Sequence, residues 1–570
     1  MQQEFKISTN AFKKLTLLYV KSEFDPNGES EIRICKSESG TEVAKQIVDS
    51  PKGWHYTCSL QPFTDYTIIL HATSIPYAYL HDSCISVFES GMDFIDFDHA
   101  CPGTSLIVNK TNMRKAYDQP FRNQYHFSSI KNWLNDPNGL CYFQGNYHLF
   151  FQMNPFHLHW DTMYWGHAVS KDLIHWTHLP IVFFPQETLK DNKNRKGGAY
   201  SGCVVTKPDM LEFYFTRCDT PFVRGPETIE LQQEAYSEDG IYAKGEHTII
   251  SRRPVGNHDY NFRDPKVIVL DGIPTMMIAT TVDGICSVLT YRFNGTKWNY
   301  EGIMFEDKTV DCRTFECANL IQDPDSDYCA VICSLQDCSD DRGRKRLSKI
   351  YIGKRKGIQL SVEKEQILDF GTGSYALQTL ETPVCTYAFG WCVDTYDEFP
   401  GTGNISNGCM TLPKQCTLQS TELHIRPAKA VRLLDDYIIY DAPCKKHNRL
   451  SVVDNTYRIE ASFRKKTTFK YILAENDEQW VGLQYDGNEL QFLYGQKDSL
   501  PTIQLGIHTE VLKNLEIFVD RSVIEVFVND GAQFGTKMYF IVNTTHRLSF
   551  DFDNPESVIR NKVTMLKNIW

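Results

Sequence analysis

Long hydrophobic runs are what this 570-residue sequence lacks. No stretch approaches the ~20 apolar residues of a membrane-spanning helix. Near the N-terminus the apolar run 15–20 (LTLLYV) falls short of the ~7–15 residues at the centre of a secretory leader, and no small-residue cleavage site follows it. We therefore expect a cytoplasmic protein with no membrane partner.

A basic face is also missing. Lys and Arg number 59 against 71 Asp and Glu, which gives a formal net charge of -12. Nucleic-acid binding requires clustered positive charge, so the composition argues against a nucleic-acid partner. The one basic run, RGRKRLSK at 342–349, follows three aspartates and is predicted to be a solvated loop.

Metal-site spacing is absent among the cysteines. The chain has 18 cysteines, but no CxxC pair and no Cys/His spacing typical of a metal site. Several lie in apolar, strand-like stretches, for example Cys333 and Cys392. A reduced cysteine in a cytosolic protein behaves as a small buried hydrophobic residue. We therefore expect free thiols and no bound metal.

Short segments rich in β-branched and aromatic residues dominate the chain, whereas helical periodicity is rare. Examples are YHLFF at 147–151, VIVL at 267–270 and the stretch 515–528. Such segments, bounded by Gly, Asp, Asn or Pro, are typical of all-β proteins such as propellers and sandwiches.

Four regions follow from this pattern. Residues 1–115 alternate polar and apolar residues and are predicted to form a small N-terminal accessory β module. Residues 116–427 have room for five four-stranded blades of roughly 60 residues, which predicts a five-bladed β-propeller. Residues 428–443 are predicted to be a partly helical linker. Residues 444–570 alternate cleanly and contain the turn signal NDG at 529–531, which predicts a C-terminal β-sandwich.

Three short acidic motifs lie in the predicted propeller. They are WLNDPNG at 133–139 with Asp136, FRDP at 262–265 with Asp264, and FEC at 315–317 with Glu316. DPNG by itself favours a turn for backbone reasons alone. Carboxylates on separate blades, however, converge on the central channel of a propeller. A glycosidase needs one carboxylate to attack the sugar and one to transfer a proton, and a third can orient the substrate.

The surroundings of Asp136 extend the pattern. Matching segments are YHLFFQ at 147–152, WGHAVSKDLIHW at 165–176, YSG at 200–202, RDP at 263–265, EC at 316–317 and FVDRS at 518–522. From about residue 120 to 550 the chain resembles glycoside hydrolase family 32, the invertases, inulinases and levanases. The resemblance implies a five-bladed propeller followed by a sandwich, and retaining hydrolysis of β-fructofuranosides.

Roles for the carboxylates come with this resemblance. Asp136 is the implied nucleophile and Glu316 the implied general acid/base, while Asp264, beside Arg263, is implied to hold fructose hydroxyls and stabilise the transition state. A retaining enzyme needs its two carboxyls about 5–5.5 Å apart. Glu316 has to stay protonated near neutral pH. We expect its chain neighbours to supply an apolar setting and the two aspartates to supply negative charge.

Further contacts follow from position in the motifs. The implied substrate-binding residues are Asn135 and Gln152 as partners of fructose hydroxyls, Trp160 and Tyr200 as apolar walls, Ser201 as another polar contact, and Arg263. Ordinary core packing is the alternative for Trp160, since tryptophan is usually buried. His167, His175, Asp520 and Glu525 also lie in matched motifs and are predicted to be structural.

The chain departs from the family pattern in several places. Ala318 and Asn319 follow Glu316-Cys317 where the family has Pro-Asp, and Gly373 stands in place of an aspartate. None of these changes removes a catalytic carboxylate. They border the leaving-group side, so they bear on substrate choice more than on activity.

The predicted function is exo-acting hydrolysis of terminal fructose from sucrose and short fructo-oligosaccharides, through a covalent fructosyl-enzyme and without a metal or organic cofactor. A phosphorylated sucrose would need Arg or Lys clustered on the leaving-group side, and the sequence shows no evident cluster. A fructosyltransferase using the same intermediate is the first alternative, and a non-catalytic sugar-binding protein is the second. The oligomeric state is left open.

Overall fold

The computed structural model of the chain describes residues 2–22, 30–82, 87–98, 106–256, 261–393, 403–497, 499 and 502–570. Nearly all regular structure in these ranges is β-strand. The helices are the short α1 (Val87–Ser90) and α2 (Met113–Ala116) and the 3-10 turns η1 (Glu187–Leu189), η2 (Lys429–Leu434) and η3 (Pro555–Ser557). The prediction of an all-β chain is confirmed. None of the helices in these ranges is long and apolar enough to cross a membrane.

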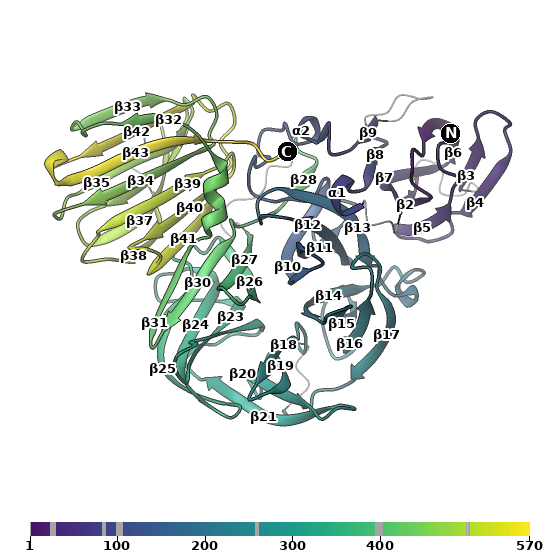
Figure 1. Ribbon diagram of the computed structural model, residues 1–570, viewed down its shortest axis with the longest axis horizontal. Coiled ribbons are helices and arrows are strands. Elements are labelled where there is room, and N and C mark those ends of the chain that lie inside the picture. The colour runs from purple at the N-terminus through teal and green to yellow at the C-terminus, as the bar shows by residue number, and fades with distance from the viewer. Residues whose placement is uncertain are drawn as a thin grey trace.

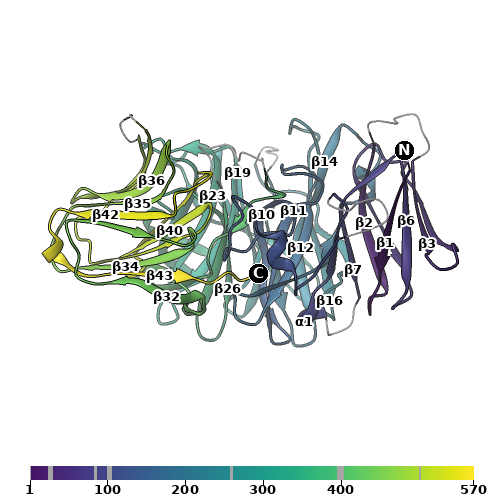
Figure 2. The same ribbon diagram turned by 90° about the horizontal axis from the view of Figure 1, so that it is seen from above.

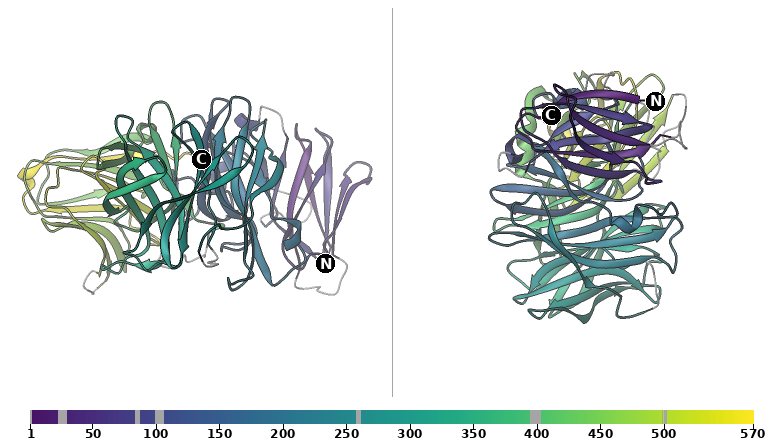
Figure 3. Two further views of the ribbon diagram at one scale, coloured as in Figure 1. Left: turned by 90° about the horizontal axis from the view of Figure 1, so that it is seen from below. Right: turned by 90° about the vertical axis from the view of Figure 1, so that its right-hand side faces the viewer.

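Three bodies make up the molecule. A ring of sheets lies at the centre, with the N-terminal module and a C-terminal stack of sheets on its two sides (Figure 1). The views from above and below place these two outer bodies at opposite ends of the molecule (Figures 2 and 3). The ring is therefore the body that contacts both of the others.

The N-terminal module packs two sheets on each other. One contains β1 (Gln2–Ser8), β6 (Asp65–His71), β3 (Glu31–Lys36) and β4 (Glu42–Ile47), and the other contains β5 (Trp54–Ser59), β2 (Lys14–Lys21), β7 (Thr73–His81), β8 (Asp93–Asp96) and β9 (Leu106–Val108). Alternate side chains of both sheets, such as Ile68 and Leu17, share one apolar core. Val169 and Leu179 of the ring belong to the same core, so apolar packing fixes the module to the ring.

Five antiparallel sheets follow in chain order along the described part of the ring. The first two sheets contain β10 (Asn132–Phe143), β11 (Asn146–Asn154), β12 (Tyr164–Ser170) and β13 (Trp176–Phe183), and then β14 (Arg195–Thr206), β15 (Leu211–Pro221), β16 (Ile229–Ser237) and β17 (Lys244–Ile250). The third and fourth sheets contain β18 (Lys266–Leu270), β19 (Ile273–Val282), β20 (Ile285–Phe293) and β21 (Trp298–Asp307), and then β22 (Phe315–Gln322), β23 (Tyr328–Ser339), β24 (Lys345–Lys356) and β25 (Gln359–Ile367). The fifth sheet contains β26 (Ser374–Glu381), β27 (Thr386–Cys392), β29 (Cys409–Met410), β30 (Lys414–Gln419) and β31 (Glu422–Pro427). β28 (Ser406–Asn407), from the last part of the ring, pairs with β10 of the first sheet. This pairing closes the ring into a propeller and covers the edge of β10 at that point.

The C-terminal body is a β-sandwich, as predicted. One sheet contains β32 (Asp435–Asp441), β43 (Val558–Leu566), β34 (Tyr457–Phe463), β39 (Asn514–Val519), β40 (Val523–Val528) and β41 (Gln533–Met538), and the other contains β33 (His447–Ser451), β42 (Arg547–Phe552), β35 (Phe469–Glu475), β36 (Gln479–Tyr485), β37 (Glu489–Gln496) and β38 (Thr502–His508). Residues 529–531, the predicted hairpin turn, connect β40 and β41 and have positive φ angles.

The structure differs from the predicted linker over residues 428–443. Only Lys429–Leu434 form the helical part, as η2. Asp435–Asp441 form β32, which pairs with β43 at the edge of the sandwich. The segment YIIY at 437–440 is rich in aromatic and β-branched residues, which favour a strand when a partner edge is available.

Buried charges join the propeller to the sandwich. His126 lies between Asp520, whose Oδ2 is 2.9 Å from its Nδ1, and Glu525, whose Oε1 is 3.1 Å from its Nε2. Lys414 Nζ pairs with the same Glu525, and all four side chains are inaccessible to solvent. The prediction that Asp520 and Glu525 are structural agrees with this position.

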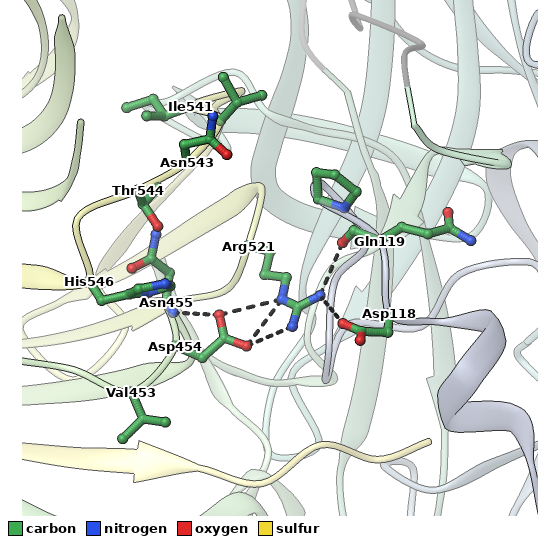
Figure 4. A pocket seen from close by; sticks show the side chains of 12 residues that line it. Asp118, Gln119, Val453, Asp454, Asn455, Arg521, Ile541, Asn543, Thr544 and His546 are labelled. Carbon is green, nitrogen blue, oxygen red and sulfur yellow. Dashed lines mark hydrogen bonds and ion pairs between the residues drawn. The ribbon is translucent and has the colours of Figure 1, made fainter. Parts of the chain in front are cut away.

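A more exposed ion pair network lies at the rim of the same junction, in a pocket between the two domains (Figure 4). The Arg521 guanidinium donates to Asp454 Oδ2 at 2.8 Å and to Asp118 Oδ1 at 3.1 Å. It also donates to the Gln119 carbonyl oxygen at 3.0 Å. One guanidinium therefore connects the sandwich with the segment that leads into β10.

All cysteines in the described ranges are free thiols. Cys84 and Cys101 lie outside the described residues. Cys333 and Cys392 are buried in apolar clusters, as their strand contexts predict. Within the same ranges, no group of three His, Cys, Asp or Glu residues is arranged to hold a metal ion.

Candidate active site

One cavity of about 400 Å³ gathers the predicted catalytic and binding residues. It is lined by Asp136, Asp264 and Glu316 together with Asn135, Gln152, Trp160, Tyr200, Ser201 and Arg263. These residues come from β10, β11, the turn before β12, β14, the segment before β18, and β22. Every residue of the predicted set therefore borders one space, although the set spans residues 135 to 316 of the chain.

Irregular backbone presents the carboxylates to this cavity. β10 has a bulge between Leu134 and Pro137, which brackets Asp136, and β22 has one that starts at Glu316. A bulge adds a residue to one strand and turns its side chain away from the regular alternation. Asp264 adopts a φ of 61°, a left-handed conformation that is uncommon for a residue other than glycine. Two β-bulges and one left-handed residue thus direct the three predicted catalytic side chains to the cavity.

Two polar side chains hold the carboxylate of Glu316. Arg263 donates from Nη2 at 2.7 Å and from Nε at 3.2 Å to Oε2, and the Tyr375 hydroxyl on β26 donates to Oε1 at 2.6 Å. The apolar setting predicted for Glu316 is therefore wrong. Phe315 packs into an apolar core because adjacent strand residues point to opposite faces, and the Cys317 thiol donates to Asp264 Oδ2 at 3.4 Å.

Asp136 lies half-buried at the cavity and accepts a hydrogen bond of 2.7 Å from Ser201 Oγ. Burial, followed by the negative charge of Glu316, raises the pKa of Asp136 to about 6, while hydrogen bonds and the Arg263 charge act in the opposite direction. Asp136 is therefore ionised at neutral pH and takes up a proton in mildly acidic solution.

Asp264 is more completely enclosed. Burial raises its pKa above the usual range, although the Arg263 guanidinium, 3.8 Å from its Oδ2, opposes this effect. The negative charges of Glu316 and Asp136 act in the same direction as burial. The Arg263 guanidinium thus lies beside Asp264 and also pairs with Glu316, at 2.7 Å from its Oε2.

Trp160 stands at the mouth of the cavity and not in a core. Its side chain is 37% exposed, so the core-packing alternative is excluded. Its ring meets the Tyr200 ring edge-on with centroids 6.1 Å apart, and Lys196 Nζ lies 4.6 Å from its centroid. Two aromatic rings and one cation therefore form a wall of the cavity.

The amides of Asn135 and Gln152 lie at the cavity and are fixed by neighbouring groups. Asn135 Oδ1 accepts from Trp133 Nε1 at 2.8 Å, and Gln152 Nε2 donates to the Ala199 carbonyl at 3.0 Å. Gln152 keeps its Oε1 outside the bond to Ala199, whereas the amide nitrogen of Asn135 hydrogen-bonds the Asp136 carboxylate. A fixed amide with a free polar atom can bond a sugar hydroxyl without further ordering.

Family models match both large domains of the chain. The Glycosyl hydrolases family 32 N-terminal domain matches residues 126–427, and the Glycosyl hydrolases family 32 C-terminal domain matches residues 454–567. The chain belongs to glycoside hydrolase family 32. It is a glycoside hydrolase of the invertase type.

Several relatives support this membership. A levanase of Bacillus subtilis (strain 168) is 26% identical over 501 residues, which cover 80% of this chain and 72% of the relative. Raffinose invertase of Escherichia coli is 28% identical over 432 residues, covering 73% of this chain and 89% of the relative. A sucrose-6-phosphate hydrolase of Zymomonas mobilis is 28% identical over 435 residues, which cover 71% of this chain and 83% of the relative.

Solved structures share the fold. A family 32 glycoside hydrolase of Bifidobacterium adolescentis superposes with a TM-score of 0.87 at 23% identity and covers the whole of both chains. A β-fructofuranosidase of Bombyx mori gives a TM-score of 0.69 at 21% identity and covers 80% of this chain and 97% of its own. The N-terminal module is therefore within the match to the first structure.

Cavity residues outside the predicted set complete the wall of this family 32 site. They are Trp133, Met163, Lys196, Arg224, Gln336, Arg346, Tyr375 and Trp391. Trp133 lies in the motif WLNDPNG at 133–139, so the sequence holds a local signal for it. Lys196 and Arg224 are isolated cations on the sequence, and no local pattern marks them.

Arg346 corrects two predictions. It belongs to the run 342–349, for which the sequence predicts a solvated loop, but residues from 345 onward form β24 and Arg346 borders the cavity. Its guanidinium lies 6.0 Å from the Tyr375 ring centroid and 5.7 Å from that of Trp391. Together with Lys196 and Arg224 it gives the cavity a group of cations, where the sequence indicates none.

The two histidines of the matched motifs lie away from the cavity. His167 is buried, stacks on Phe150 with ring centroids 4.1 Å apart, and lies 3.0 Å from the His148 ring nitrogen. His175 is partly exposed and pairs with Asp172 at 2.8 Å. Their positions agree with the structural roles predicted for them.

Proposed function

We propose that this family 32 enzyme is a retaining, exo-acting β-fructofuranosidase that releases terminal fructose from sucrose and short fructo-oligosaccharides. The observation that carries the proposal is the convergence of Asp136, Asp264 and Glu316 on one cavity of sugar size. Relatives named levanase, raffinose invertase and invertase 2 support the substrate class. So do solved relatives that contain sucrose and fructosylnystose.

In this mechanism the Asp136 carboxylate attacks the anomeric carbon of fructose, while the Glu316 carboxyl delivers its proton to the oxygen of the departing sugar. A covalent fructosyl-enzyme forms on Asp136. Glu316, now ionised, removes a proton from water, which attacks the anomeric carbon and restores Asp136. Asp264 accepts hydrogen bonds from fructose hydroxyls.

The neighbours of these groups suit their roles. Ser201 orients the Asp136 carboxylate, and Arg263 and Tyr375 fix both oxygens of Glu316. Fixed donors and acceptors need no reorganisation when charge moves during the reaction. Carboxyl groups and water suffice for the chemistry, so the proposal requires no cofactor.

Sugar release by the purified protein tests the proposal. Sucrose, 1-kestose, inulin and levan are supplied separately, and fructose, glucose and transfer products are separated by chromatography. Fructose from sucrose and kestose, with little from the polymers, is the expected result. Longer products formed at high sucrose would favour a fructosyltransferase, and no release from any substrate would leave the sugar-binding alternative.

Sucrose 6-phosphate is a second candidate substrate, because of the cations in the cavity. Arg346 lies over Tyr375, which itself bonds Glu316, so Arg346 is on the side where a departing sugar receives its proton. Relatives named sucrose-6-phosphate hydrolase agree with this possibility. A kcat/KM at least about tenfold higher for sucrose 6-phosphate than for sucrose, lost in Arg346→Gln, would establish this preference; equal values would remove it.

The cytoplasmic location expected from the sequence remains part of the proposal. It restricts the natural substrates to sugars small enough to be imported. Fractionation of the native cells, followed by immunodetection of the protein, tests it. Detection only outside the cells would overturn this part and leave the chemistry unaffected.

A further inference from the structure

Loop 48–53 of the N-terminal module, between β4 and β5, contacts segments of the propeller that border the cavity. Ser50 is fully buried and its Oγ donates to the Lys190 carbonyl oxygen at 2.8 Å. Lys190 Nζ in turn pairs with Asp49 Oδ1 at 3.3 Å. The loop is therefore bonded to the segment that leads from η1 into β14, the strand that carries Lys196 and Tyr200.

Lys52 contacts the first residue of β14. Its ammonium group donates to the carbonyl oxygen of Arg195, the residue before Lys196. Burial lowers the pKa of Lys52, and the negative charges of Asp161, next to Trp160, and of Asp219 oppose this effect. The Lys52 ammonium is thus bonded to the strand that carries Lys196, and the charge of Asp161, in the segment of Trp160, acts on it.

Gly53 fixes the second segment by close packing. A Cβ atom at this position would lie only 2.4 Å from a ring carbon of Phe156. Phe156 belongs to the turn 155–163 between β11 and β12, which also carries Trp160. Because glycine has no side chain, the loop backbone can lie directly against the ring, and the ring cannot move toward the module.

Aromatic contacts extend the same support. His55 stacks on Trp54 of its own strand, with ring centroids 5.0 Å apart, and lies 4.3 Å from the ring of Phe184. Phe184 follows β13 and precedes the segment that contains Lys190. The module therefore contacts the segment between β13 and β14 at Phe184 and Lys190, and the start of β14 at Arg195.

From these contacts we propose that loop 48–53 determines the position of the Trp160–Lys196 wall and thereby the affinity of the active site for its sugar. This inference rests on the proposed fructosidase function for its kinetic part only. Lys52 is a positioning residue, since it acts through the Arg195 carbonyl and does not itself line the cavity.

Amide hydrogen exchange tests the positioning without any activity. Lys52→Met is compared with wild type and with Lys45→Met, which removes a lysine of β4 whose ammonium pairs with Glu31. Exchange of the amides in 155–163 and 195–198 should become about tenfold faster in Lys52→Met, and should be unchanged in Lys45→Met. Unchanged exchange in Lys52→Met overturns the proposal.

Kinetics test the consequence for the sugar. Lys52→Met should raise KM for sucrose and kestose about 3–10-fold with kcat within about twofold, because a wall that binds substrate and transition state alike affects KM alone. Lys52→Arg should restore most of the loss, since it keeps a charged donor. Faster exchange with unchanged KM would overturn the link to affinity.

Gly53→Ala supplies a second variant that keeps the lysine. Its methyl group displaces the Phe156 ring, so it should produce the same increase in KM and the same faster exchange in 155–163. Exchange or KM at the wild-type value would contradict the inference. If the wild type releases no fructose from any sugar, the proposed function fails, and the exchange data alone decide whether loop 48–53 positions the wall.

Discussion

Two groups of buried carboxylates in this molecule have opposite electrostatic surroundings. At the propeller–sandwich junction, Asp520 and Glu525 face the cations of His126 and Lys414. Burial by itself would raise the pKa of Glu525, but Lys414 and His126 outweigh burial and lower this pKa to about 2. The same two carboxylates, also against burial, raise the pKa of His126 to about 9.

In the cavity, the Arg263 guanidinium pairs with Glu316 and opposes the pKa rise of Asp136 and Asp264, and Lys196, Arg224 and Arg346 line the same space. There burial and mutual repulsion raise the pKa of Asp136 to about 6. Charges that are matched one for one can hold two domains together, whereas uncompensated charges cost stability and provide reactive groups near neutral pH. The direction of the pKa change, and not burial itself, therefore distinguishes Glu525 of the junction from Asp136 of the cavity.

Removing the attacking carboxylate gives the largest expected effect. Asp136→Asn should lower kcat for sucrose by a factor on the order of 10⁴ or more, because an amide cannot replace the nucleophile. Initial-rate measurements at saturating sucrose check this. Asp209→Asn, at an exposed bend, is the matched control and should keep wild-type activity. Residual activity within about a hundredfold of wild type would assign the nucleophile elsewhere.

Breaking the matched charges should affect folding instead of chemistry. Glu525→Gln leaves Lys414 and His126 buried without a full counter-charge, which should cost about 3–5 kcal/mol of unfolding free energy. Urea denaturation at pH 7 measures the loss. Glu422→Gln, which removes an exposed partner of Lys364, should cost under about 1 kcal/mol. Activity per folded molecule should stay near wild type, and a large fall in kcat without loss of stability would contradict the comparison.

The Tyr375 hydroxyl should affect chemistry moderately. Tyr375→Phe removes a donor to Glu316, and a hydrogen bond to an ionisable carboxyl contributes about 1.5–3 kcal/mol, so kcat should fall roughly 10–100-fold. Its control is Tyr142→Phe, on a half-exposed ring of β10. Steady-state rates across pH 4–9 provide the readout. An unchanged kcat at every pH would show that Tyr375 does not act on the acid/base.

The acidic limb of the pH profile should report on Asp136. Since its carboxylate must be ionised to attack and its pKa is about 6, kcat/KM should fall about tenfold per pH unit below that value. Rates from pH 4 to 8 in constant ionic strength measure this limb. The limb should stay in Tyr375→Phe. A midpoint near 4 would show that the nucleophile is not destabilised by its surroundings.

Stability should depend on pH with opposite signs for Asp136 and Glu525, because their pKa values change in opposite directions. Asp136 has a folded pKa above its unfolded value, so its protonated form adds stability at pH below about 4, and this is lost as pH rises through about 6. Asp136→Asn should therefore be roughly 1–2 kcal/mol more stable than wild type at pH 7.5, with part of the effect screened by water in the cavity. The difference should vanish near pH 4; a destabilised variant at pH 7.5 would reverse the interpretation.

The stability contributed by the charges of the propeller–sandwich junction should change at pH values other than those at which Asp136 titrates. His126 contributes stability that is present below about pH 6.5 and is lost as pH rises through about 9. Glu525 contributes stability above about pH 4.5 that is lost as pH falls through about 2. Thermal unfolding between pH 4 and 10 should show that the stability contributed by His126 and Glu525 weakens only at the alkaline end.

Some features follow from the sequence by itself, because they depend on near neighbours. A side-chain period of two and turn residues at fixed positions predict strands, the sandwich and the hairpin at 529–531. Residues in a distinctive local pattern, such as Asp136 and Glu316, are identifiable from the motifs alone, as are the predicted substrate-binding residues that border the same cavity.

Tertiary structure alone decided what surrounds those residues. Whether 437–440 forms a linker or an edge strand depends on β43, more than a hundred residues away. Whether Glu316 meets apolar or polar groups depends on Arg263 and Tyr375, which arrive from neighbouring sheets. Lys196 and Arg346 border the cavity because separate strands converge there. Charge and burial act through space, so their values are determined only when distant segments of the chain are brought together.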